Sequence, residues 1–274
     1  RPGAPKSGNT VKGIHPVSSL KDYLEKNHID DPEKIHRPPN TGKTSISLRI
    51  YDIKDIGEAA DSGADNIIIS DYRALFGRSG PGGGDPDSIK GIPGNIIIDT
   101  PDIIYDRDMD NILAALQEVL ESGRVRLRIS NTGLLEALKE RPGAAPGEKY
   151  ILLGGTLNIS NTLSASFYDS FIPNIGGWEF SPEIDRTEIA DIISSFGKTH
   201  RSGYLFSLFA HGYFRVITAR HSIRYGRKRD NIKGPIFLKD RKDYRFRVQE
   251  AEKNNSNIYN SKRICLFFDL DKVL

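Results

Sequence analysis

The chain has 274 residues, of which 37% are hydrophobic and 27% charged, and its formal net charge is +3. This composition suits one large globular domain or two small ones. A single cysteine excludes a disulfide scaffold and any metal centre built from several thiolates. Because no apolar run is long enough to span a bilayer, we expect no membrane partner. The lone thiol and the lack of a signal-peptide pattern favour reducing, cytoplasmic surroundings.

The first 44 residues are rich in Pro, Gly, Asn and Lys, which predicts a linker or arm. The chain opens on Arg1 rather than on methionine, so we expect a segment of a longer polypeptide. Other domains or subunits of the same protein are then further expected partners.

Short apolar segments alternate with amphipathic ones from residue 45 onward. The apolar segments predict seven strands, at residues 45–51, 64–70, 94–100, 124–130, 149–160, 176–181 and 204–212. The amphipathic segments predict helices at residues 52–63, 109–123, 131–141, 161–171 and 182–197.

This alternation indicates βα units on a parallel sheet, and therefore the α/β class. No dinucleotide-binding glycine pattern follows the first strand, which favours a (β/α) TIM-like barrel over a doubly wound sheet. We expect the barrel core to span residues 45–212. An eighth unit would lie beyond Leu274, so the barrel in this chain is expected to be incomplete.

The pattern of alternating strands and helices ends after residue 212. Short β-type segments at 213–220, 235–240, 244–249 and 256–268 predict a small antiparallel subdomain, spanning 213–274, after the seventh strand. Alternation within "YRFRV" predicts that Arg245 and Arg247 face solvent while Tyr244 and Phe246 face a core.

A basic block overlaps this subdomain. Between Lys198 and Arg247, 14 Lys and Arg residues outnumber three acids. Such a block beside aromatic residues predicts RNA or another polyanion as partner, with a solvated basic face as the alternative. The candidate RNA-binding residues are Arg220, Arg224, Arg227, Lys228, Arg229, Lys242 and Arg245.

Functional residues of a barrel lie at the carboxyl ends of its strands. Among the polar residues there, Asn158 and Asn161 are candidates for substrate binding. Asn131 and Asn161 precede predicted helices, and helix capping is the favoured role of Asn131. Asp99 has the alternative role of starting a turn. The full set of strand-end candidates is Asp71, Asp99, Asn131, Asn158, Asn161, Glu179, Glu183 and His211.

Two of these residues are candidates for acid–base catalysis. His211 titrates near neutral pH in its unperturbed state and precedes Gly212 at a predicted strand end. Glu183 lies four residues after Glu179 across a strand–helix junction, so these two carboxylates are a candidate acid–base pair. The favoured catalytic pair is Glu183 with His211.

Other catalytic and metal motifs are missing from the sequence. There is no G-x-S-x-G elbow and no H-E-x-x-H helix. His211, His221 and Cys265 are the only plausible soft ligands, and their spacing matches no compact metal motif, which predicts no metal. Cys265 lies in the apolar run "ICLFF", which predicts a buried structural thiol.

An ordered set of segments resembles the collagenase-like peptidase U32 family over about residues 45–274. The segments include "SLRIYDIKDIGEAADSGADNIIIS", "LNISNTLSASFYDSF", "FSPEID", "FAHGYFRVITARHS", "LKDRKDYRFRV" and "IYNSKRICLFFDLDKVL". The resemblance is greatest to the C-terminal barrel of long members. It implies an open or incomplete TIM-like barrel, with a catalogued hydrolase (peptidase) activity. It also implies relatives that act in RNA hydroxylation.

Better understood members of that family carry an iron–sulfur cluster on four cysteines. This chain departs from that pattern, because the aligned positions of two of them hold Arg215 and Ser222. Cys265 stands where a later cysteine often lies, but one thiolate does not hold such a cluster. We therefore expect no cofactor in this segment.

These observations leave three hypotheses for function. The favoured one is an accessory or degenerate barrel that binds RNA in an RNA-modification context. The alternatives are a hydrolase acting on peptides and a noncatalytic scaffold subunit of a protein complex.

Overall fold

The computed structural model describes residues 45–70, 95–121, 125–139, 151–172, 175–199, 204–223, 234–250 and 255–265. Its strands form one parallel and one antiparallel sheet. Several predictions concern residues outside the described ones, namely the arm 1–44, Asp71, Arg224, Arg227, Lys228 and Arg229.

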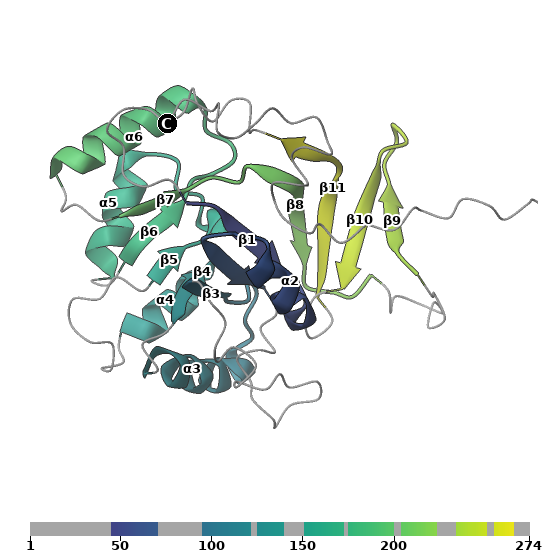
Figure 1. Ribbon diagram of the computed structural model, residues 1–274, viewed down its shortest axis with the longest axis horizontal. Coiled ribbons are helices and arrows are strands. Elements are labelled where there is room, and N and C mark those ends of the chain that lie inside the picture. Colours follow the sequence, from purple (N-terminus) through teal and green to yellow (C-terminus); the bar gives the residue numbers. More distant parts are fainter. Residues whose placement is uncertain are drawn as a thin grey trace, which may run out of the picture.

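Seven parallel strands form the larger sheet, and each pairs with its neighbours in sequence order. This order is typical of a (β/α) barrel, whereas the strand order of a doubly wound sheet reverses. The sheet curls into a half-barrel with β1 and β7 at its edges (Figure 1), so the expected incomplete α/β barrel is confirmed. The strands are β1 (Ser47–Ile50), β2 (Asn66–Ile69), β3 (Asn95–Asp99), β4 (Val125–Ile129), β5 (Ile151–Leu153), β6 (Ile175–Glu179) and β7 (Leu205–Ser207).

Helices follow most of these strands and pack on the outer side of the curled sheet (Figure 1). None of the described helices is both long and apolar enough to cross a membrane. They are the 3-10 helix η2 (Ile53–Asp55), α2 (Ile56–Asp61), α3 (Asp106–Glu121), α4 (Thr132–Lys139), the 3-10 helix η5 (Gly155–Leu157), α5 (Thr162–Phe171) and α6 (Arg186–Thr199).

The main core lies between this sheet and the helices. Side chains alternate across a strand, so Leu127 and Ile129 of β4 are fully buried in this core while Arg128 points to the concave side. On β6, Trp178 packs edge-on against Phe196 of α6, with ring centroids 4.7 Å apart. On these strands, apolar side chains pack toward the helices, whereas the polar side chain of Arg128 points to the concave face.

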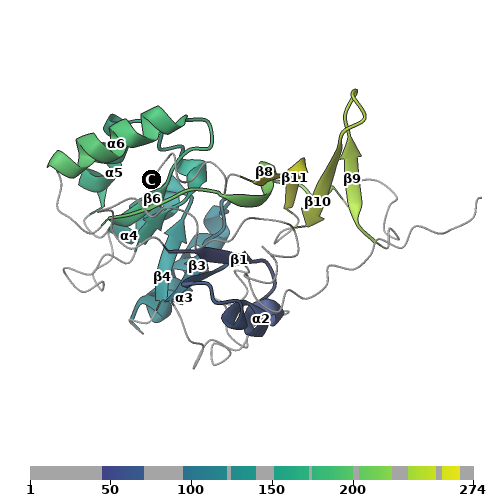
Figure 2. The same ribbon diagram turned by 45° about the horizontal axis from the view of Figure 1, so that its top comes forward.

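The second sheet is antiparallel, with strand order β8-β11-β10-β9. Its strands are β8 (His211–Ala219), β9 (Ile236–Lys239), β10 (Arg245–Glu250) and β11 (Ser256–Cys265). All four strands predicted after residue 212 are therefore confirmed. The sheet projects beside the half-barrel, with β8 nearest and β9 farthest from it (Figures 1 and 2).

Two predicted strands are too long. The segment 149–160 forms only the short β5, because the chain turns into η5 and Asn158 then adopts a left-handed φ of 52°. The segment 204–212 ends as β7 at Ser207, and His211 already begins β8 of the other sheet. The run from Tyr204 to Phe209 is apolar apart from Ser207, and one serine is a weak turn signal, so the pattern joined two strands into one.

Candidate functional site

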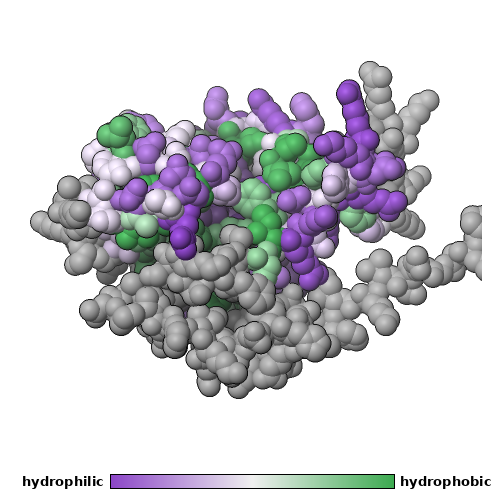
Figure 3. Space-filling view, turned by 90° about the horizontal axis from the view of Figure 1, so that it is seen from above, coloured by the Kyte–Doolittle hydropathy of each residue, from purple (hydrophilic) through white to green (hydrophobic). Residues whose placement is uncertain are grey.

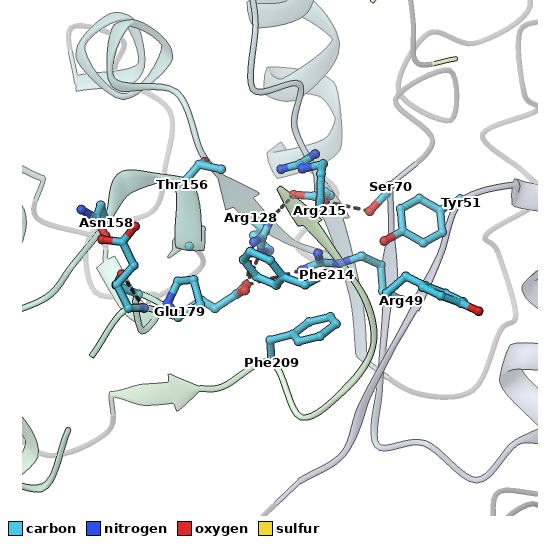
Figure 4. Close-up of a pocket in the computed structure, with 16 residues that line it drawn as sticks. Arg49, Tyr51, Ser70, Arg128, Thr156, Asn158, Glu179, Phe209, Phe214 and Arg215 are labelled. Atoms are coloured by element: carbon cyan, nitrogen blue, oxygen red, sulfur yellow. Dashed lines mark hydrogen bonds and ion pairs between the residues drawn. The ribbon is translucent and has the colours of Figure 1, made fainter. Parts of the chain in front are cut away.

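A small pocket lies at the carboxyl ends of the parallel strands, where barrel proteins place their functional residues (Figure 4). Its volume is about 260 Å³, slightly below the roughly 300–1,000 Å³ of drug-sized sites. Residues from β1, β3, β4, β6 and the start of β8 line it. Its polar residues include Arg49, Ser70, Asp99, Arg128, Thr156, Asn158, Glu179, Glu183 and Arg215, and its aromatic ones are Tyr51, Phe209, Tyr213 and Phe214.

A buried arginine holds the floor of this pocket together. Arg128 Nη1 is 2.5 Å from Asp99 Oδ1, and Arg128 Nη2 is 2.6 Å from Glu179 Oε2. Arg128 Nε donates a further bond to Glu179 Oε2 at 3.0 Å, and Ser70 Oγ donates to Asp99 Oδ2 at 2.8 Å. Arg128 is only 4% exposed, so these bonds replace the water that its charge has lost.

Both carboxylates of this network stay ionised at neutral pH. Burial alone raises their pKa values, but Arg128 and Arg49 outweigh it and hold the pKa of Asp99 and of Glu179 below the ordinary range. The same two carboxylates raise the pKa of Arg128, although burial opposes them. Glu179 is therefore unsuited to act as a general acid near neutral pH.

Two consecutive glycines after β5 make room for the network. A Cβ atom on Gly154 would lie 1.9 Å from Ser130 Oγ and 3.0 Å from Arg128 Cζ. A Cβ atom on Gly155 would lie 3.0 Å from Glu179 Oε1. The "GG" pair at the strand end is thus explained by the large side chains packed against it.

Arg49 of β1 reaches the same network from the opposite edge of the sheet. Its Nη2 lies 3.4 Å from Glu179 Oε2, which joins the first and sixth strands across the concave face. This is a long contact compared with the bonds of Arg128, so Arg49 is the more loosely held of the two arginines.

The antiparallel sheet supplies the remaining wall. Arg215 Nη2 of β8 is 2.5 Å from Asp102 Oδ2, just after β3. Tyr259 of β11 contacts Tyr51 edge-on, with ring centroids 5.9 Å apart. Burial raises the pKa of Asp102, although the charge of Arg215 opposes the rise. These contacts fix β8 over the strand ends, so the pocket is built by both sheets.

Four of the strand-end candidates lie at this pocket, namely Asp99, Asn158, Glu179 and Glu183. Asp99 forms a buried ion pair, so its role exceeds that of a turn residue. Glu179 pairs with arginines, whereas Glu183 is exposed and lines the same pocket.

Two of the asparagine candidates cap helices. Asn131 Oδ1 accepts a bond from Leu134 N at 2.9 Å, which confirms the predicted cap of α4. Asn161 Oδ1 accepts one from Ser164 N at 2.9 Å, in a capping box at the start of α5. Asn161 is not among the residues that line the pocket, and the role that the structure shows for it is this cap.

His211 does not lie at the strand end where it was expected. It pairs with Cys265 in the ladder between β8 and β11, and the pocket lining includes Glu183 but not His211. Burial, with the nearby charge of Arg263, lowers the pKa of His211. The prediction of a buried Cys265 is wrong, because this thiol is exposed at the end of β11.

The described candidates for RNA binding are all exposed. Arg245 lies on β10 and Lys242 in the turn before it, while Arg220 stacks on Tyr105 with 4.6 Å from its Cζ to the ring centroid. Arg245 and Arg247 face solvent as predicted, whereas Tyr244 is 45% exposed, which contradicts its predicted place in a core.

Three arginines of the pocket, Arg49, Arg128 and Arg215, were not among the residues predicted for the site. A usable signal exists for the first two, because a strand of a parallel sheet is covered on both faces and rarely holds a charge. A charged residue flanked by apolar ones, as in "SLRI" and "RLRI", therefore indicates a buried ion pair. Among the described residues, no group of three acids, histidines or cysteines is arranged to hold a metal ion.

The fold and this pocket define an open α/β half-barrel protein with a small, charge-balanced cavity between its two sheets. Comparisons with protein-family models, with curated proteins and with solved structures gave no match. The assignment of function therefore begins from the chemistry of the exposed and pocket residues.

Proposed function

We propose that this chain is an accessory TIM-like domain that binds RNA through one face of its antiparallel sheet. The contact surface is the β9–β10 surface, defined by Phe237 and Lys239 of β9 with Arg245 and Arg247 of β10. The observation that carries the proposal is an exposed aromatic ring set among three cations on an open sheet.

Strand register places these four side chains together. Residues directly opposite each other in an antiparallel pair project from the same face. Phe237 is opposite Arg247, and Lys239 is opposite Arg245. The two pairs are separated by two residues on each strand. Because side chains alternate with a period of two, both pairs lie on one face of the sheet.

This surface is open to solvent. Phe237 is 50% exposed, and all three cations are exposed. Hydrophilic side chains surround the part of the molecule that holds β9 and β10 (Figure 3). The acid that faces this surface is Asp243, whose carboxylate is 2.7 Å from Lys239 Nζ with both groups well solvated. Such a pair contributes roughly 0–1 kcal/mol and yields readily to a phosphate.

Single-stranded RNA matches the two kinds of side chain present. Lys and Arg neutralise phosphates, while an exposed ring stacks on an unpaired base. Sheets that carry aromatic residues among cations are a recurring platform for single-stranded RNA. The sequence resemblance to a family with members that act on RNA, at a position lacking their cluster ligands, further supports an accessory binding role.

The proposal is tested by titrating unstructured single-stranded RNA with the full chain, by fluorescence polarisation, across a salt series. Replacing Lys239, Arg245 and Arg247 together with glutamine removes three phosphate contacts. With a slope of about −0.7 per contact for single strands, the plot of log affinity against log salt should become shallower by about 2. Phe237→Leu should weaken binding at every salt concentration by roughly 1–3 kcal/mol and leave the slope unchanged.

A matched control removes the same charge elsewhere. Lys54, Arg107 and Arg186 are exposed on or beside helices of the outer layer, and their triple glutamine variant should bind with nearly wild-type slope. An equal loss of RNA affinity in the two triple variants would mean that net charge alone drives binding. That result would refute the proposed contact surface. Binding to an acidic protein but not to RNA at low salt would favour the scaffold hypothesis instead.

A further inference from the structure

The pocket between the two sheets is balanced in charge. Its lining holds three arginines, Arg49, Arg128 and Arg215, and three carboxylates, Asp99, Glu179 and Glu183. Each arginine forms an ion pair, and the partner of Arg215 is Asp102, which lies behind the lining. A ligand that brought an unmatched charge would therefore disturb this balance in a poorly solvated site.

A hydrogen-bond donor in the pocket has no partner. Arg49 Nε is buried and makes no hydrogen bond to any described residue. Of the five N–H donors of this guanidinium, only Nη2 has a recorded contact, the 3.4 Å bond to Glu179. Arg49 lines the cavity, and its guanidinium therefore has unused N–H donors for an anionic group.

An acceptor in the same pocket is also uncommitted. Glu179 Oε2 accepts bonds from Arg49 Nη2, Arg128 Nε and Arg128 Nη2. Glu179 Oε1 accepts none from the residues that the structure describes. The absent side chain of Gly155 leaves free the space 3.0 Å from Oε1 that a Cβ atom would occupy.

Aromatic rings form another part of the lining. Phe209 and Phe214 pack edge-to-face with centroids 5.3 Å apart, and they line the cavity together with Glu179 and Arg49 (Figure 4). Tyr51 and Tyr213 complete the apolar part of the lining. The pocket therefore combines a cationic donor, an anionic acceptor and an aromatic wall within a volume suited to one small molecule.

We propose that this pocket binds a free α-amino acid with a large apolar or aromatic side chain, as the zwitterion. The ligand carboxylate pairs with Arg49, its ammonium group donates to Glu179 Oε1 and to Glu183, and its side chain packs on Phe209 and Phe214. A zwitterion satisfies both uncommitted groups and adds no net charge. The inference goes beyond RNA binding, because none of the four residues of the β9–β10 surface lines this pocket.

The test compares L-phenylalanine with two analogues, each lacking one charge, by isothermal titration calorimetry on the full chain. The analogues are 3-phenylpropionate, without the ammonium group, and phenethylamine, without the carboxylate. L-phenylalanine, or another apolar amino acid such as L-tyrosine or L-leucine, should bind saturably. The matching acid and amine should bind at least tenfold more weakly, because each leaves one charged group of the pocket without its partner.

Two variants localise the site. Arg49→Met should abolish binding, and thermal unfolding of this variant checks that it is folded. Gly155→Ala, which places a methyl group against Glu179 Oε1, should weaken the amino acid tenfold or more while leaving 3-phenylpropionate unchanged. Arg107→Met, on the exposed side of α3, is the matched control and should bind like the wild type.

Three results would overturn the inference. One is the absence of saturable binding by any standard amino acid. Another is equal affinity for the amino acid and for either single-charge analogue. The third is saturable binding of free nucleosides without binding of amino acids, which would assign the donor and acceptor to a nucleobase edge.

Discussion

Replacing Arg128 with methionine is the most direct perturbation of the pocket. Methionine keeps the length and apolar stem of the side chain but removes the cation between Asp99 and Glu179. Asp99 is buried and the side chain of Glu179 is only 12% exposed, so water replaces little of the stabilisation that the two carboxylates lose. The variant therefore leaves two acids close together in a region of low dielectric, where Arg49 is the remaining cation near Glu179.

The expected loss of unfolding free energy is large. Removing one partner from a buried ion pair costs roughly 3–5 kcal/mol, and Arg128 serves two carboxylates. Typical domains are stable by only about 5–15 kcal/mol, so the effect is readily measured. Replacing Asp99 with asparagine and Glu179 with glutamine in the same variant should recover part of it, because neutral amides cost less to bury.

The assay is urea unfolding followed by circular dichroism at pH 7 and near pH 4. Arg107→Met is the matched control, because this side chain is 77% exposed and its loss should change stability by less than about 0.5 kcal/mol. In the wild type, Arg128 lowers the pKa of Asp99 and of Glu179, so the stability it contributes at pH 7 is lost as the pH falls through those lowered values.

In the variant, the contribution of these two carboxyl groups to the free energy of unfolding changes with pH in the opposite direction. Without Arg128, burial raises the pKa of both carboxyl groups, so the folded state binds protons before the unfolded state does. The gap between variant and wild type should therefore narrow on acidification from pH 7 to about pH 4. A loss below about 1 kcal/mol at pH 7, or a gap that stays constant with pH, would refute the reasoning.

Two further substitutions test the local geometry by the same unfolding assay. Gly154→Ala should cost about 1–3 kcal/mol, because its methyl group collides with Ser130, whereas Gly57→Ala in the open surface of α2 should stabilise by about 0.5–1 kcal/mol. A Gly154 variant with unchanged stability would mean that the strand end moves to accommodate the methyl group. Asn161→Ala should lower the free energy of unfolding by about 1 kcal/mol through loss of the α5 cap, whereas Asn111→Ala on the exposed side of α3 should have little effect. Equal changes in stability for these two variants would argue against capping.

The parallel sheet could be predicted because several of its strands consist of consecutive apolar residues. The triplets Ile67–Ile69 and Ile96–Ile98 are apolar on both faces, as strands covered on both sides must be. Amphipathic helical segments separate these strands along the sequence, and this alternation is typical of βα units. The four antiparallel strands were found for a different reason, since polar turns separate short alternating segments.

The pocket could not be predicted to the same extent. Strand periodicity puts Arg126 and Arg128 on one face of β4, but it does not say which acids lie across the sheet. That depends on the register of β3 and β6, which is fixed by tertiary packing. His211 was misplaced because an apolar run broken only by Ser207 hides the passage from one sheet to the other. Only the shape of the sheets decides where such a run divides.

The contacts between the two sheets also bear on the order of events during synthesis. Arg49, near the start of the described chain, and Arg215, near its end, line the same cavity, and Tyr51 is covered by Tyr259. Most of the half-barrel is therefore translated before the wall of its pocket exists. A nascent chain must keep an uncovered, charged concave surface until β8 and β11 leave the ribosome. Contacts so distant in sequence slow folding, and the cavity is among the last features to form.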